Sequence, residues 1–93
     1  MNKKKLYSAR KKIDLLDKSI FNLIKKRTKI VNHILSLKKF KKQIVDLKRI
    51  NIILKNIRKK SIQHNIDPKI TSSIWRAMIG SFIDYEKRNF KKK

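Results

Sequence analysis

Arg27 interrupts a series of apolar side chains that recur every seven residues. The other members of this series are Leu6, Ile13, Ile20 and Ile34. A guanidinium on an apolar stripe needs an anionic partner, because an unpaired buried charge is very costly. Lys38 follows eleven residues later, almost three helical turns, and therefore points in nearly the same direction. The two cations therefore lie on nearly the same face of the helix.

Arg10 lies seventeen residues before Arg27, about 25 Å along a helix axis, so no small molecule contacts both in one helix. If two such helices pack antiparallel in a homodimer, Arg10 of one chain approaches the Arg27–Lys38 region of the other, which creates two equivalent sites. Arg49 and Glu86 are candidates to complete each site. The alternative is an ordinary structural ion pair of Arg27, for which the candidate partners are Asp14, Asp17 and Glu86.

Several kinds of chemistry are not expected. The chain has no Cys, and its two histidines, His33 and His64, lie far apart, so we expect no disulfide, no cysteine nucleophile and no zinc or other metal site. No apolar stretch has the length of a secretory signal core or a membrane span. We therefore expect a soluble cytoplasmic protein that does not act at a membrane.

The formal net charge of +22, from 28 basic and 6 acidic residues, is the dominant compositional feature. Its basic residues are mostly Lys, spread along a chain that is also rich in Ile and Asn, as expected of a gene rich in A and T. The main alternative is a basic helical protein that binds nucleic acid, in which the turn at Asn65–Pro68 belongs to a helix-turn-helix. A phosphate-binding surface needs exposed cations, whereas the arginines lie on or near apolar stripes. We therefore do not expect nucleic acid as a partner.

The apolar pattern predicts an all-α fold with one long helix and two shorter ones. A second stripe accompanies the first, consisting of Ala9, Leu16, Leu23, Ile30 and Leu37. The helices are expected at about 5–40, 46–64 and 68–90, in a single domain that spans 1–93. Asp46 is placed to begin the second helix, and Asp67-Pro68 the third. Gly80 inside the third helix is expected to allow close packing.

The first helix is too long for a monomer of this size. About 35 residues make a helix of about 50 Å. A compact domain of 93 residues has a radius of gyration of only about 12 Å. The apolar stripes therefore need a second chain, and we expect an intertwined homodimer.

The residues that break the pattern also carry a family resemblance. The first helix of the all-helical (class II) chorismate mutases resembles three segments of this chain in order: Arg10-Lys-Lys-Ile-Asp-Leu-Leu-Asp, then Leu23-Ile-Lys-Lys-Arg27, then Lys38. Asp46-Leu-Lys-Arg49 resembles the start of their second helix. The segments Ile66–Pro68, Ile74–Ile79 and Phe82–Glu86 resemble their third. The resemblance covers nearly the whole chain in order and spacing.

The resemblance implies a role for each matching residue. Arg10 of the neighbouring subunit and Arg27 would clamp the substrate carboxylates, since guanidinium forks match carboxylates in a bidentate way. Lys38 would donate to a carboxylate and to the ether oxygen of chorismate, which Glu86 would also face. Arg49 would add positive potential, and the backbone N–H of Phe82 would contact a carboxylate.

The implied reaction is the Claisen rearrangement of chorismate to prephenate, which feeds phenylalanine and tyrosine synthesis. It is pericyclic and needs no nucleophile, base, metal or cofactor. The enzyme holds the reactive conformer and stabilises charge on the breaking C–O bond. Lys38, Glu86 and Arg27 are therefore the expected catalytic residues.

Ile50 departs from the family pattern. Many chorismate mutases have Glu at this position, where it holds the substrate hydroxyl group. An apolar residue here resembles the isochorismate–pyruvate lyases, which share the fold. The hydroxyl would then need another partner, for which Asp46 is the candidate. The mutase is favoured because it serves general amino-acid synthesis.

Overall fold

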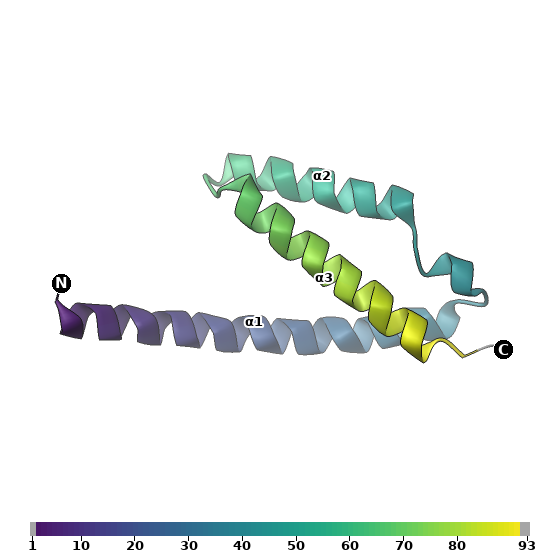
Figure 1. Ribbon diagram of the computed structural model, residues 1–93, viewed down its shortest axis with the longest axis horizontal. Helices are drawn as coiled ribbons and strands as arrows, with labels where there is room; N and C mark the ends of the chain where they lie inside the picture. Colours follow the sequence, from purple (N-terminus) through teal and green to yellow (C-terminus); the bar gives the residue numbers. More distant parts are fainter. Residues whose placement is uncertain (1, 92–93) are drawn as a thin grey trace. The chain divides into compact units, whose positions relative to one another are not determined.

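The computed structural model describes residues 2–91, which form helices and the turns between them (Figure 1). In chain order these are α1 (Lys3–Leu37), the short 3-10 helix η1 (Lys41–Gln43), α2 (Leu47–Gln63) and α3 (Pro68–Asn89). No strand occurs between residues 2 and 91. The all-α fold with one long and two shorter helices is therefore confirmed. Residues 1, 92 and 93, the ends of the expected domain, lie outside the described residues.

The chain divides into two units, Met1–Val31 and Asn32–Lys93. The first unit contains most of α1. The second contains the last turns of α1 together with η1, α2 and α3. That all of these segments form a single domain stays a prediction.

Both ends of α1 are set by side-chain amides. At the start, Asn2 Oδ1 accepts hydrogen bonds from the backbone N–H groups of Lys4 and Lys5, at 3.1 and 3.2 Å. At the other end, Gln43 Oε1 accepts from the N–H groups of Lys39 and Phe40, both at 2.8 Å. These two N–H groups are thereby taken from the helical hydrogen-bond ladder, which explains why α1 ends at Leu37 and not near residue 40.

The turn between α2 and α3 follows from local sequence. Asn65 adopts a left-handed conformation with φ 57°. The N–H of Ile66 donates to Ser61 O at 2.9 Å and that of Asn65 to Ile62 O at 3.3 Å, the pattern of a Schellman helix end. Asp67 then caps α3 by accepting from Lys69 N at 2.9 Å, and Pro68 occupies the first turn of the helix.

The helices α2 and α3 pack against each other. Ser61 is buried in α2, and its hydroxyl lies 2.6 Å from Thr71 Oγ1 of α3. Leu47, the first residue of α2, is 69% exposed. Gly80 was expected in a close contact, but a Cβ at this position would meet no atom within 4 Å.

Little apolar surface is buried in the isolated chain. Among residues 2–91, the buried apolar side chains are Ile44 and Ile79. Helix α1 has no buried residue, and most of its two apolar stripes are exposed to solvent. Even so, none of the helices within residues 2–91 has a segment apolar and long enough to cross a membrane.

Candidate active site

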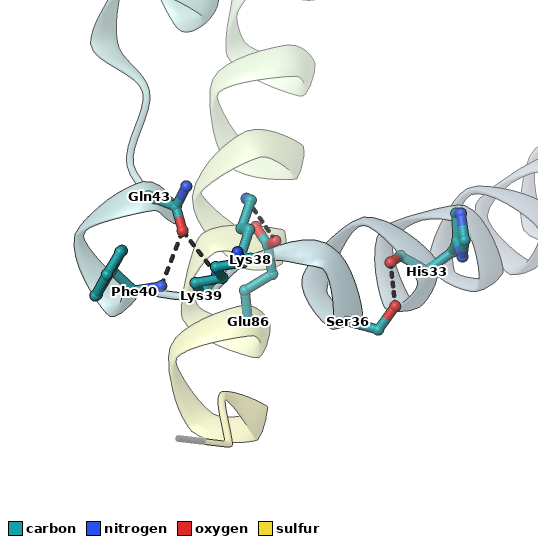
Figure 2. A network of polar contacts seen from close by, with 7 residues as sticks. All are labelled: His33, Ser36, Lys38, Lys39, Phe40, Gln43 and Glu86. Carbon is teal, nitrogen blue, oxygen red and sulfur yellow. Dashed lines mark hydrogen bonds and ion pairs between the residues drawn. The ribbon is translucent and has the colours of Figure 1, made fainter. Parts of the chain in front are cut away.

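An ion pair joins the end of α1 to α3. Lys38 Nζ donates to Glu86 Oε1 at 2.9 Å, although the two residues are 48 positions apart in the sequence (Figure 2). The side chain of Glu86 is 8% exposed and that of Lys38 is 19% exposed. The pair therefore combines a carboxyl group and an ammonium group in a place that is mostly shielded from water.

Backbone structure on both sides holds this pair. Lys38 is the first residue after α1, and its N–H donates to Leu35 O at 3.1 Å. The side-chain amide of Gln43 accepts hydrogen bonds from the backbone N–H groups of the two residues that follow Lys38, as Figure 2 shows. Glu86 lies in the last turn of α3, which ends at Asn89. Both side chains therefore extend from ordered backbone.

A second polar link lies beside the ion pair. Tyr85 precedes Glu86 in α3, and its hydroxyl donates to Asn32 Oδ1 of α1 at 2.6 Å. The sequence did not identify Asn32 or Tyr85 as candidate site residues. Tyr85 could have been suspected because it is adjacent to Glu86, but no spacing in the sequence indicates Asn32 as its hydrogen-bond partner.

Lys38 also borders an open hollow of about 490 Å³. The other lining residues are Gln43, Val45, Asp46 and Leu47. Asp46 Oδ1 accepts from Arg49 N at 3.0 Å and caps α2, which holds the carboxylate at the rim. Lys38 therefore pairs with Glu86 and, together with Asp46, borders the hollow.

The remaining candidates of this unit lie on α2 and α3. Arg49 is exposed in the first turn of α2, next to the half-buried Ile50. Phe82 is half-buried in α3, one turn before Glu86. Its backbone N–H lies inside a regular helix, where such groups bond the carbonyl four residues earlier. A contact from this N–H to a substrate carboxylate would therefore have to share the proton, and this role stays a prediction.

Arg10 and Arg27 belong to the other unit. Both lie on α1, where Arg10 is exposed and Arg27 is half-buried. Their separation of seventeen residues along one helix keeps them about 25 Å apart. Their expected roles as carboxylate clamps stay predictions.

The residues between 2 and 91 include no cluster of three or more His, Cys, Asp or Glu side chains that could hold a metal ion. The carboxyl groups of Glu86 and Asp46 each accept an identified hydrogen bond, Glu86 from Lys38 Nζ and Asp46 from Arg49 N. The chemistry that this arrangement supports is hydrogen bonding and electrostatic stabilisation of an anionic ligand.

Comparison with known families agrees with this description. The model of the chorismate mutase type II family matches residues 9–87, which include every candidate residue from Arg10 to Glu86. The chain therefore belongs to the chorismate mutase type II family. No curated protein and no solved structure gave a significant match.

Proposed function

We propose that this protein is a cytoplasmic chorismate mutase, which rearranges chorismate to prephenate for phenylalanine and tyrosine synthesis. The observation that carries the proposal is the ion pair between Lys38 Nζ and Glu86 Oε1 at 2.9 Å. The family resemblance assigns both side chains to one atom, the ether oxygen of chorismate. Two groups that act on one atom must lie next to each other, and these two do so across 48 positions of sequence.

The pair suits the charge that develops in this reaction. As the C–O bond breaks, negative charge grows on the ether oxygen, and a fixed donor stabilises it more in the transition state than in the ground state. The Lys38 ammonium has three donors, so it can bond Glu86 and the substrate at the same time. Glu86 donates a second hydrogen bond to the ether oxygen only when it is protonated.

We further propose that the active enzyme is an intertwined homodimer. The support is the exposed apolar surface of α1: Ile13 is 56% exposed and Ile30 is 60% exposed. A single chain of this size buries too little surface to be stable with such a helix in water. In the dimer, Arg10 of one subunit and Arg27 of the other clamp the substrate carboxylates, and Arg49 adds positive potential.

Isochorismate–pyruvate lyase activity is the second candidate, and Ile50 favours it. This apolar side chain is half-buried in the first turn of α2, next to Arg49, where many mutases carry a Glu. In the mutase proposal, Asp46 holds the substrate hydroxyl instead. Its carboxylate borders the same hollow as Lys38, which supports that role.

The test supplies the purified protein with chorismate and isochorismate in separate reactions and resolves the products by chromatography. The proposal expects prephenate from chorismate. It also expects Lys38→Ala to lower kcat by about 10²–10³, the usual loss when one preorganised donor is removed. Lys39→Ala is the matched control, since Lys39 is the adjacent lysine and is exposed, and it should retain activity.

The other outcomes point to specific alternatives. Salicylate and pyruvate formed from isochorismate alone would identify the lyase. No turnover of either compound would reject both enzymes and favour the basic nucleic-acid-binding alternative. Affinity for nucleic acid would then fall steeply with added salt, because binding releases counterions from the phosphates.

A further inference from the structure

The Asn32–Tyr85 hydrogen bond lies where the geometry of the Lys38–Glu86 pair is set. Asn32 is on α1, six residues before Lys38, and Tyr85 is the immediate neighbour of Glu86 on α3. The same two segments are therefore joined twice, at 2.6 Å by the hydroxyl and at 2.9 Å by the ion pair. The roles implied by the family resemblance do not use either residue of the first link.

Within one chain, apolar packing does little to hold these segments together. In this unit the packing is concentrated between α2 and α3. At the end of α1, Ile34 is 43% exposed and Leu37 is 64% exposed. Directional polar contacts therefore have a larger share in orienting the end of α1 against α3 than they would in a well-packed core.

Two links constrain the segments more than one does. Adjacent residues of an α-helix project about 100° apart around the axis, so Tyr85 and Glu86 hold α3 from two directions. The ion pair alone lets the end of α1 pivot about this one contact with α3, because the Lys38 stem is flexible. The hydrogen bond from the Tyr85 hydroxyl to Asn32 opposes this motion, because a pivot about the ion pair would break it.

We propose that Asn32 and Tyr85 are positioning residues, which hold Glu86 and Lys38 in the geometry that the rearrangement requires. This inference rests on the proposed function. It adds a pair that does not touch the substrate and acts through the orientation of two groups that do. Catalytic groups lose rate when displaced by about 0.5 Å or 10–20°, so a lost positioning contact should lower kcat.

The first experiment is a set of four variants measured for kcat and KM. Tyr85→Phe removes only the hydroxyl, and Asn32→Ala removes only the acceptor. Each should lower kcat about 3- to 10-fold, as expected for one ordinary hydrogen bond, with little change in KM. The double variant should be no worse than either single variant. Asn32→Asp keeps an acceptor oxygen and should retain most of the activity.

Tyr7→Phe is the matched control, because Tyr7 is the only other tyrosine of the chain and is 62% exposed on α1. Its ring lies 4.8 Å from Lys11 Nζ, a contact that Phe preserves. This variant should have the kcat of the unmodified enzyme. A kcat unchanged in Tyr85→Phe would overturn the inference and leave the proposed function intact.

A second measurement does not depend on activity. The ammonium ¹⁵N signal of Lys38 reports its pairing and is assigned by its loss in Lys38→Gln. In Tyr85→Phe we expect this signal to shift toward its position in Glu86→Gln, whereas in Tyr7→Phe it should stay unchanged. If the protein turns over neither chorismate nor isochorismate, the proposed function fails. The NMR comparison then still decides whether the Tyr85 hydroxyl orients the Lys38–Glu86 pair. An unchanged Lys38 signal in Tyr85→Phe would overturn that inference.

Discussion

Removing Lys38 leaves a buried carboxylate without its ionic partner, which should destabilise the fold. The Glu86 side chain is 8% exposed and that of Lys38 is 19% exposed, so the pair is largely withdrawn from water. Breaking such a pair from one side costs about 3–5 kcal/mol, and the partial exposure of Lys38 places Lys38→Met near 3 kcal/mol. Glu86→Gln keeps an acceptor for the ammonium and should cost about 1 kcal/mol.

In Lys38→Met the buried carboxylate has lost its charged partner, so the variant should have a lower free energy of unfolding than the unmodified protein. Replacing both residues by Met should restore part of the stability, because no buried charge then remains.

The assay is urea denaturation at one fixed protein concentration, since the stability of the proposed dimer would depend on concentration. Lys39→Met is the control, because Lys39 is exposed, and it should change the free energy of unfolding by less than about 0.5 kcal/mol. A Lys38→Met protein as stable as this control at pH 7 would refute the reasoning.

Three further predictions concern activity. If Glu86 must be protonated to donate to the ether oxygen, activity should fall as the pH rises and Glu86→Gln should flatten the pH–rate profile, whereas an unchanged profile contradicts that role. If each site combines Arg10 of one subunit with Lys38 of the other, Arg10→Ala and Lys38→Ala should each be inactive. Refolding the two variants as an equal mixture should restore about a quarter of the activity, since half of the dimers then have one intact site. Asp46→Ala and Asp67→Ala each remove one N-cap, and each should lower the stability measured by thermal unfolding by about 1 kcal/mol. Only Asp46→Ala should also lower kcat/KM for chorismate, and equal kcat/KM values in the two variants would show that Asp46 is not part of the site.

The helices were predictable because their signals are local. Asp67-Pro68 begins α3 and Asn65 terminates α2, and both act within a few residues of their own position. The end of α1 was placed about three residues too late. Its position depends on the side-chain amide of Gln43, which accepts hydrogen bonds from the N–H groups of Lys39 and Phe40. The periodicity of apolar residues does not show that a side chain competes with the helical carbonyl groups for these N–H groups.

Candidate residues were predictable only in part. Arg27 and Lys38 could be identified because a cation on an apolar stripe conflicts with the pattern around it. Glu86 became a candidate through its place in the family pattern. The Asn32–Tyr85 link could not be foreseen, because each residue by itself is an ordinary polar side chain on a helix.

By itself, the sequence determined that the chain is helical, where its capped turn lies and which cations conflict with their surroundings, because these properties depend on near neighbours and on side-chain type. Only the tertiary structure decided that Lys38 meets Glu86 and that Tyr85 meets Asn32. These contacts join residues about fifty positions apart, and they depend on how the α2–α3 hairpin returns the chain toward the end of α1. The angle of that return arises from the packing of whole helices, which no short stretch of sequence specifies.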